Sequence, residues 1–339
     1  MRRFSAVVLV AATMGAALTA VPAQAAHANC TATACHFDVP PGTYDVKVLL
    51  GGDAASSTSV TAETRRTLLP ETAVEAGKRV ARTFTVNVRT PEGEPTGADG
   101  TPGLDLQLGG SVPALADIAV TPARHARQIF LVGDSTVCDQ PGDPYSGWGQ
   151  QLPQYLRKGL SVANYADSGE STVSYLADSR LWATVQPRIR RGDLVLIQLA
   201  HNDKATDGAT YRANLETLVA GVRATGGKPV LVTPIVRRWF NVDGTLNNDT
   251  ALLVNGLGVD HPAVIRSVAA DDVLLIDLTA KTKALVESLG VEASKALYLY
   301  NDKRDNTHTS VHGATTYASL VRDELVARHL VPKRLMRVG

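Results

Sequence analysis

The chain has 339 residues, a formal net charge of +1, a hydrophobic content of 44% and a charged content of 20%. This composition excludes an intrinsically disordered chain and is typical of a globular protein, with enough length for two domains. The nearly balanced charge creates no global field that would attract nucleic acid or an anionic membrane, so we expect neither as a partner.

Residues 1–25 have the pattern of a secretory signal peptide. Arg2 and Arg3 precede an apolar stretch over 6–21, and Ala23-Gln24-Ala25 has the small-x-small pattern of a cleavage site. The alternative is a membrane anchor, but the stretch is short, and no other run approaches the roughly 20 apolar residues that a span requires. We therefore expect a secreted, extracellular protein without a membrane anchor.

The three cysteines are consistent with export, which permits disulfides. Cys30 and Cys35 are five positions apart, and we expect a small bridge between them. Cys138 is then left over. It is either a reactive thiol or a small buried apolar side chain, and the second interpretation is favoured.

Residues 26–122 predict a small all-β domain. Alternating apolar and polar residues over 44–50 and 82–89 indicate half-buried strands, and turn sequences such as Gly51-Gly52-Asp53 separate them. Several short strands in this arrangement favour a β-sandwich or a jelly roll. We interpret 112–127 as a linker. The domain is accessory: it either binds carbohydrate or covers one side of the domain that follows.

Residues 123–339 predict an α/β domain. Continuous apolar runs, as in strands buried on both faces, occur at 128–132, 162–165, 194–199, 230–233 and 273–276. Helical patterns occur at 148–158, 211–224, 262–270, 281–289 and 313–328. This alternation predicts a three-layer, flavodoxin-like fold with a parallel sheet between helices.

Ligands of such sheets bind beyond the carboxyl ends of the strands. Ser135 follows the first run, where Gly133 allows a sharp turn that exposes the hydroxyl; a helix N-cap is the alternative. Gly169 follows the second run and can present a backbone N–H, unless it is an ordinary turn glycine. Asn202 follows the third run and can donate its amide to an oxyanion, with an Asx turn or helix cap as the alternative.

Asp305 and His308 precede the last predicted helix and have a spacing that lets one loop supply both. A serine nucleophile needs a base, and a carboxylate orients the imidazole that acts as one. The alternative is a pair of solvated loop residues. His308 and His312 also have the spacing of a metal pair, but the turn-like sequence and the lack of a third ligand argue against a metal. We expect a Ser135–His308–Asp305 triad, oxyanion donors from Ser135, Gly169 and Asn202, and no metal or cofactor.

Together these residues resemble the SGNH (GDSL-like) hydrolase family over about 128–330, and more narrowly its rhamnogalacturonan acetylesterase branch. The motifs that carry the narrower resemblance are Gly133-Asp134-Ser135-Thr136-Val137, Gly147-Trp148-Gly149, His201-Asn202-Asp203 and Asp305-Asn306-Thr307-His308-Thr309-Ser310. The N-terminal domain resembles the β-domain that precedes some bacterial members, around 62–66 and 83–89. The resemblance implies a serine esterase that removes O-acetyl groups from rhamnogalacturonan, other pectin or a related plant polysaccharide.

One departure from the branch concerns the substrate. Members often carry an arginine directly after the glycine that corresponds to Gly169. This chain has Glu170 there, which weakens the expectation of an anionic galacturonan as substrate. Arg237, Arg238 and Trp239 are candidate substrate contacts, and Trp148 is expected in the core.

Two other functions stay open. A lipase or short-chain esterase on the same fold would need an apolar groove or lid, and the sequence has 5% aromatic residues and no apparent amphipathic lid. A non-catalytic carbohydrate-binding protein would not need the complete set of five site residues. We expect a monomer that acts on an acetylated polysaccharide.

Overall fold

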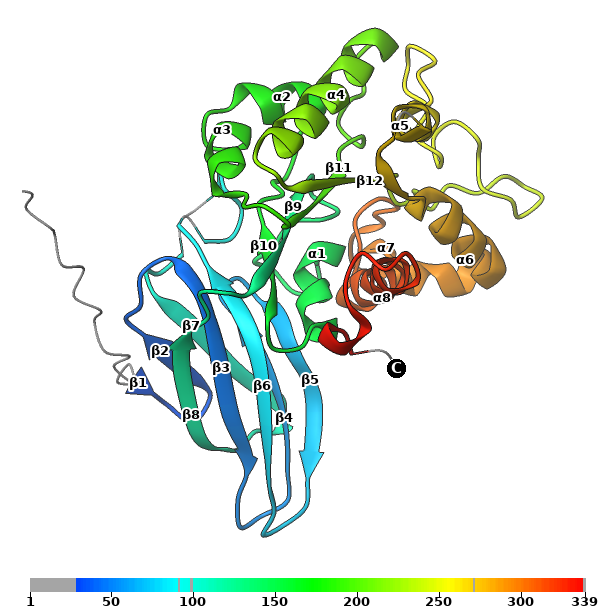
Figure 1. The fold of residues 1–339 in the computed structure, drawn as a ribbon. Helices are drawn as coiled ribbons and strands as arrows, with labels where there is room; N and C mark the ends of the chain where they lie inside the picture. The colour runs from blue at the N-terminus through cyan, green and yellow to red at the C-terminus, as the bar shows by residue number, and fades with distance from the viewer. Residues whose placement is uncertain (1–28, 91, 98–99, 271, 338–339) are drawn as a thin grey trace, which may run out of the picture.

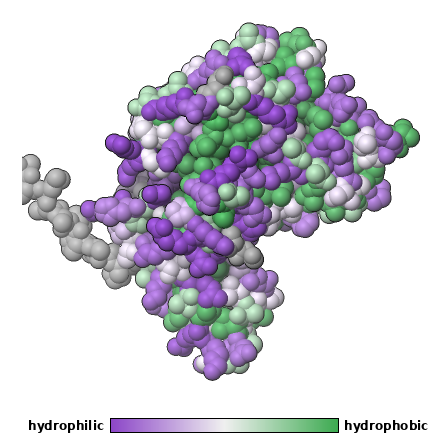
Figure 2. Space-filling view, turned by 45° about the vertical axis from the view of Figure 1, so that its right-hand side comes forward, coloured by the Kyte–Doolittle hydropathy of each residue, from purple (hydrophilic) through white to green (hydrophobic). Residues whose placement is uncertain are grey.

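The computed structural model describes residues 29–90, 92–97, 100–270 and 272–337, so the predicted signal peptide over 1–25 lies outside the described residues. An all-β lobe is followed by a larger α/β lobe (Figure 1). Both lobes carry interleaved hydrophilic and hydrophobic side chains on the face shown in Figure 2. Within the described ranges, every helix is too short or too polar to cross a lipid bilayer.

The N-terminal lobe is a sandwich of two antiparallel sheets. One sheet has the strand order β1-β2-β7-β4-β5 and the other β6-β3-β8. The strands are β1 (Asn29–Cys30), β2 (Ala34–Phe37), β3 (Gly42–Gly51), β4 (Ser56–Ala62), β5 (Arg66–Val74), β6 (Arg79–Val88), β7 (Leu104–Val112) and β8 (Leu115–Pro122). A disulfide joins Cys30 to Cys35, which connects β1 to β2.

The alternating sequence of β3 explains how the sandwich closes. Val46, Val48 and Leu50 are all 0% exposed and pack into the core between the sheets, while the side chains between them point outward. Burying each such side chain contributes roughly 1.5–3 kcal/mol. The alternation predicted from the sequence thus corresponds to one face in the core and one face in solvent.

The predicted linker over 112–127 is wrong for most of its length. Residues Leu115–Pro122 form β8, which pairs with β3, and Val120 is buried in the sandwich core. Pro122 is compatible with this strand because it is the last residue, where a missing N–H costs no central ladder bond. The connection between the lobes is therefore only 123–126.

The C-terminal lobe confirms the predicted flavodoxin-like α/β fold. Its strands are β9 (Arg127–Gly133), β10 (Leu160–Asn164), β11 (Leu194–Gln198), β12 (Lys228–Val232) and β13 (Leu274–Ile276). They form one sheet in the order β10-β9-β11-β12-β13, with every neighbouring pair parallel. The first and third strands in chain order lie side by side, which is the switch point where ligands bind in such folds.

Helices cover both faces of this sheet. The long ones are α4 (Gly208–Ala224), α5 (His261–Ala270), α6 (Leu278–Ala293) and α8 (Val311–Ala327). The short ones are α1 (Trp148–Gln151), α2 (Thr172–Ala177), α3 (Trp182–Val185) and α7 (Tyr300–Lys303), with 3₁₀ turns at Leu152–Tyr155, Gln186–Arg188, Ser294–Leu297 and Lys333–Leu335. Side chains of α1, α6 and α8 pack on one face, and those of α2, α3, α4 and α5 pack on the other. The sequence patterns predicted the long helices and α1 but not α2, α3 or α7.

The sandwich packs directly against the edge strand β10 and the start of β9. The Gln128 side chain donates to Thr43 Oγ1 at 2.6 Å, and the Gly159 N–H donates to Thr85 Oγ1 at 2.8 Å. Together with the short connection, these bonds hold the two lobes against each other.

Candidate active site

The candidate nucleophile, Ser135, lies just beyond the carboxyl end of β9. Gly133 is required at the end of that strand because a Cβ there would lie 2.7 Å from Val137 Cγ2 and 3.1 Å from the Gln198 carbonyl oxygen. The glycine therefore permits close approach of the neighbouring segments. Ser135 is 6% exposed, so its hydroxyl lies in a shielded position at the switch point between β9 and β11.

Ser135, His308 and Asp305 form a continuous hydrogen-bonded series. Ser135 Oγ lies 3.1 Å from His308 Nε2, and His308 Nδ1 lies 2.6 Å from Asp305 Oδ2. A carboxylate only accepts, so Nδ1–H donates to Asp305, and in the neutral ring Nε2 is left to accept the serine proton. Such a series can deprotonate the serine as it attacks a carbonyl.

Asp305 is held in its ionised form. Partial burial by itself would raise its pKa, but the hydrogen bonds from the His308 ring and from the backbone N–H groups of His308 and Thr307 outweigh burial and lower the pKa to about 2. A carboxylate that is charged at neutral pH stabilises the imidazolium that forms when His308 takes a proton. The 2.6 Å bond between His308 Nδ1 and Asp305 Oδ2 argues against the alternative of two unpaired, solvated loop residues.

Backbone pairing holds the loop that carries His308 against the loop that starts at Ser135, here called the nucleophile loop. The Ser146 N–H donates to the Thr309 carbonyl at 3.1 Å, and Tyr145 forms an antiparallel bridge with Ser310. The Tyr145 ring packs edge-on against the His308 ring with 5.1 Å between centroids. No local pattern in the sequence indicates this contact, because the two residues are remote in the chain.

The two further oxyanion candidates, Gly169 and Asn202, lie next to each other. Asn202 Nδ2 donates to the carbonyl of Glu170, the residue after Gly169, at 3.2 Å. Gly169 has φ +85°, a conformation that favours glycine. Asn202 is only partly buried, so its second amide N–H is available to a ligand.

Three bonds connect these segments to the nucleophile loop. Asp134 Oδ2 lies 3.3 Å from His201 Nδ1, which connects the residues that precede Ser135 and Asn202. Gln140 Nε2 donates both to the Ser135 carbonyl at 3.2 Å and to Ser168 Oγ at 3.1 Å. The structure therefore brings the segments of all five predicted residues together at one edge of the sheet.

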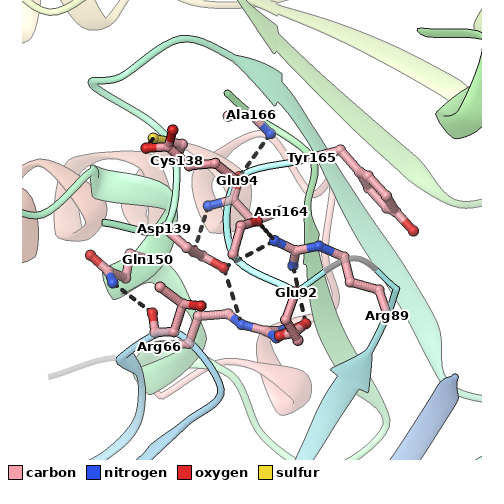
Figure 3. Close-up of polar contacts among 12 residues, drawn as sticks. Arg66, Arg89, Glu92, Glu94, Cys138, Asp139, Gln150, Asn164, Tyr165 and Ala166 are labelled. Atoms are coloured by element: carbon pink, nitrogen blue, oxygen red, sulfur yellow. Dashed lines mark hydrogen bonds and ion pairs between the residues drawn. The ribbon is translucent and has the colours of Figure 1, made fainter. Parts of the chain in front are cut away.

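A buried charge cluster from the sandwich anchors the nucleophile loop (Figure 3). Asp139 is 0% exposed, and its Oδ2 lies 3.2 Å from Arg66 Nε and 3.3 Å from Arg89 Nη2. Arg66 also donates to both carboxylate oxygens of Glu92, at 2.8 and 2.6 Å. On the opposite side, Asn164 at the end of β10 donates to Asp139 Oδ1 at 2.8 Å.

The segment after β6 also forms hydrogen bonds with the loop between β10 and α2, which contains Gly169. Glu94 Oε1 accepts from Ser168 Oγ at 2.6 Å and from Cys138 Sγ at 3.2 Å. The Thr96 N–H donates to Asp167 Oδ1 at 2.9 Å. Residues of the sandwich therefore support the two segments that flank the candidate oxyanion site.

Cys138 is a free, fully buried thiol. Burial, together with the nearby Glu94 carboxylate, raises its pKa, so the side chain remains protonated. A buried thiol of this kind is a poor nucleophile, which agrees with the structural interpretation of this residue.

The three candidate substrate contacts have different positions. Trp239 is 47% exposed and is free to contact a ligand. Arg237 is half-buried and donates to the His201 carbonyl at 3.1 Å. Its pKa is lowered by burial, against the attraction of Asp134 and Asp305, which places its charge near both carboxylates.

The predicted substrate contact of Arg238 is corrected to a structural role. Arg238 is 5% exposed and donates to Ser294 Oγ at 3.0 Å, to Asn306 Oδ1 at 2.9 Å and to the Val291 carbonyl. Its guanidinium packs over the Tyr300 ring, 4.6 Å from the centroid. The side chain therefore supports the Asp305–His308 loop. Trp148, expected in the core, is 1% exposed.

The fold and the site define a serine hydrolase of the flavodoxin-like α/β type. The family comparison agrees: residues 131–326 match the GDSL-like lipase/acylhydrolase family, and the chain belongs to this family. The chain is thus a carboxylic ester hydrolase.

Individual relatives match different shares of the chain. The chain is 37% identical over 213 residues to rhamnogalacturonan acetylesterase RhgT of Bacillus subtilis, covering 58% of this chain and 88% of the relative. It is 29% identical over 301 residues to the uncharacterized esterase YxiM of Bacillus subtilis, covering 86% of this chain and 73% of YxiM. The crystal structure of YxiM superimposes with a TM-score of 0.55 and 25% identity, covering 87% of this chain and 80% of that structure. The match to YxiM is therefore longer than the α/β lobe and extends into the sandwich.

Proposed function

We propose that this chain is a secreted serine esterase that removes O-acetyl groups from a plant cell-wall polysaccharide, with rhamnogalacturonan as its substrate. The observation that carries the proposal is the Ser135–His308–Asp305 series, with 3.1 Å and 2.6 Å between successive partners. The similarity to RhgT, whose name specifies rhamnogalacturonan, supports the choice of substrate.

The proposed reaction has two halves. Ser135 Oγ attacks the acetyl carbonyl while His308 Nε2 takes the serine proton, and the oxyanion is held by the N–H groups of Ser135 and Gly169 and by the Asn202 amide. His308 then protonates the sugar oxygen as the C–O bond breaks, which leaves an acetyl-enzyme. Water attacks the acetyl-enzyme with His308 again as base, and acetate leaves as Ser135 regains its proton.

Glu170 favours a second candidate, a neutral acetylated glycan such as acetylated xylan. Burial raises the pKa of Glu170, with hydrogen bonding from Ser174 opposing the shift. Whenever this carboxyl is ionised, it places a negative charge beside Gly169, and a polyanionic backbone would be repelled there. An acidic glycan would therefore bind less well beside Glu170, whereas a neutral glycan would not be affected by its charge.

The experiment that separates these functions is an acetate-release assay on acetylated rhamnogalacturonan, acetylated xylan and a long-chain acyl ester. We expect the highest kcat/KM on rhamnogalacturonan and near-complete loss of activity in Ser135→Ala. The matched control is Ser288→Ala, because Ser288 is an exposed residue of α6. Wild-type rates in Ser135→Ala would reject the mechanism, and a preference for the long-chain ester would favour a lipase.

A serine-reactive phosphonate tests the remaining alternative, a non-catalytic carbohydrate-binding protein. We expect labelling at Ser135, since the hydroxyl has a base within hydrogen-bond reach. A protein that binds the polysaccharide but is not labelled would support the non-catalytic function.

Secretion is proposed from the segment 1–25, and the disulfide between Cys30 and Cys35 supports it, because such bonds persist in oxidising compartments. Expression of the full chain in a secreting host should give an extracellular protein whose N-terminus begins after Ala25. An uncleaved protein retained on membranes would support the anchor instead.

A further inference from the structure

A cavity of about 350 Å³ lies between the two lobes, away from the candidate triad. Asn87 and Arg89 line it from the sandwich, and Phe130, Tyr165, Arg188 and Arg190 line it from the α/β lobe. The volume is within the range of small-ligand sites. Because both lobes contribute walls, the cavity exists only in the assembled protein.

The cavity has a strongly positive lining. Three arginines line it, and its described lining includes no aspartate or glutamate; the charge of Arg89 is balanced by Asp139 behind the lining, so the net positive charge comes from Arg188 and Arg190. Arg188 and Arg190 are exposed, and neither forms an ion pair with any carboxylate in the described ranges. Arginine is well suited to bind a carboxylate, because its planar fork can donate two parallel hydrogen bonds.

Two buried polar side chains of the lining have atoms left without partners. Arg89 is 4% exposed and Asn87 is 7% exposed. Arg89 Nε and Asn87 Oδ1 form no hydrogen bond within the described part of the chain, and Arg89 Nη1 lies 3.9 Å from the Glu92 carboxylate. The lining thus holds one unsatisfied N–H donor and one unsatisfied carbonyl acceptor, the two kinds of partner that a carboxylate and a hydroxyl group need.

Aromatic rings complete the lining. Phe130 and Tyr165 stack with 6.1 Å between centroids, and the Arg89 guanidinium packs 5.3 Å from the centroid of the Tyr165 ring. Figure 3 shows Tyr165 and Arg89 beside each other at the edge of the charge cluster. The rings are 1% and 3% exposed, so they form an apolar wall and not an open stacking face. Inorganic anions would use only the arginines, whereas a sugar can also contact this apolar wall.

We propose that this interdomain cavity is a second binding site, for a uronate residue of an acidic polysaccharide. The inference rests on the proposed function and specifies its substrate class as an acidic glycan. Attraction of a uronate by Arg188 and Arg190 would offset the repulsion that an ionised Glu170 exerts on an acidic glycan. The sandwich then contributes directly to substrate recognition.

The test is calorimetric titration of the full chain with deacetylated oligogalacturonate, which has no acetyl ester to cleave, at low salt. We expect binding that weakens as salt is added. The variant Arg188→Ala/Arg190→Ala should bind at least about tenfold more weakly, because it loses two charge-assisted partners. Both residues are exposed, so the variant should unfold at the wild-type temperature.

The matched control is Lys78→Ala/Arg79→Ala, which removes the same charge from an exposed turn and strand end of the sandwich. It should bind like the wild type, and the fully methyl-esterified oligomer should not bind. The proposal is overturned if the wild-type protein shows no binding, if Arg188→Ala/Arg190→Ala binds like the control, if methyl esterification has no effect, or if inorganic phosphate competes as well as the uronate oligomer.

This titration involves no ester cleavage, so its result is independent of the esterase proposal. A protein that binds oligogalacturonate but releases no acetate would contradict the proposed function alone. A protein that deacetylates rhamnogalacturonan without binding the oligomer in this cavity would contradict only the second site.

Discussion

Arg66 of the sandwich and Asp139 of the nucleophile loop form a buried ion pair, with 3.2 Å between Arg66 Nε and Asp139 Oδ2. Their side chains are 1% and 0% exposed. Burial alone raises the pKa of Asp139, and the charges of Arg66 and Arg89 oppose that shift. Because Asp139 lies in the loop that starts at Ser135, the sandwich contributes to the order of the catalytic loop as well as to the stability of the whole chain.

Asp139→Ala should strongly destabilise the protein. Removing one partner leaves the positive charge of Arg66 and Arg89 buried without full compensation, which costs about 3–5 kcal/mol. Urea denaturation measures this loss. The control is Asp143→Ala, because the Asp143 side chain is 77% exposed in its ion pair with Arg65 and should cost under about 1 kcal/mol. Equal losses in the two variants would show that the buried cluster has no special role.

Asp305→Asn should lower kcat about 10⁴-fold while the protein stays folded, since the amide favours the wrong imidazole tautomer. The pKa of Asp305 is about 2, so its ionisation should not shape the activity profile between pH 4 and pH 8. Because the folded pKa lies below the unfolded value, the stability from this carboxylate is present above about pH 4 and is lost as the pH falls through about 2. Steady-state rates and thermal unfolding measure the two effects, and unchanged kcat would contradict the assigned role.

Asn202→Ala should lower kcat by about 10²–10³ with a small change in KM, because the lost donor acts mainly on the developing oxyanion. The variant also loses the bond from Asn202 to the Glu170 carbonyl. Asn248→Ala, at an exposed position of the connection between β12 and α5, is the control and should have wild-type kinetics. A purely KM effect in Asn202→Ala would indicate substrate binding instead of oxyanion stabilisation.

Glu94 is expected to act as a positioning residue through Ser168. Glu94→Ala removes the acceptor of the Ser168 hydroxyl and should lower kcat by roughly 10–100-fold with KM little changed, since small displacements of catalytic donors are costly. Glu94→Gln keeps an oxygen acceptor at the same place and should restore most of the rate. If Glu94→Gln is as impaired as Glu94→Ala, or if both change only the unfolding temperature, this role is wrong.

Because of Glu63, the free energy of unfolding should fall as the pH rises. Burial, together with the nearby Glu92 carboxylate, raises the pKa of Glu63 to about 9. The unfolded chain loses this proton near pH 4.5, so between about pH 4.5 and pH 9 the folded state binds more protons and stability falls with pH. Glu63→Gln should flatten this dependence, and the exposed control Glu75→Gln should not. Thermal unfolding measured from pH 5 to pH 9 provides the comparison.

Local patterns in the sequence predicted most of the α/β lobe. Strands buried on both faces need continuous apolar runs, and the segments around Ile129, Val162 and Leu196 show them clearly. Short elements were missed because one or two turns carry too little periodicity, as in α2 and α3. The β8 strand was missed because Pro113 and Pro122 at its borders are typical of a linker.

The amino-acid sequence by itself determined the strand ends that carry Ser135, Gly169 and Asn202, and the Asp305–His308 spacing, since these depend only on local patterns along the chain. The tertiary structure decided the rest. It gave Arg238 a structural role, placed Tyr145 on His308 and paired Arg66 with Asp139. Such contacts join residues that are remote in the chain, and their energies depend on how two lobes dock and exclude water, which no local pattern encodes.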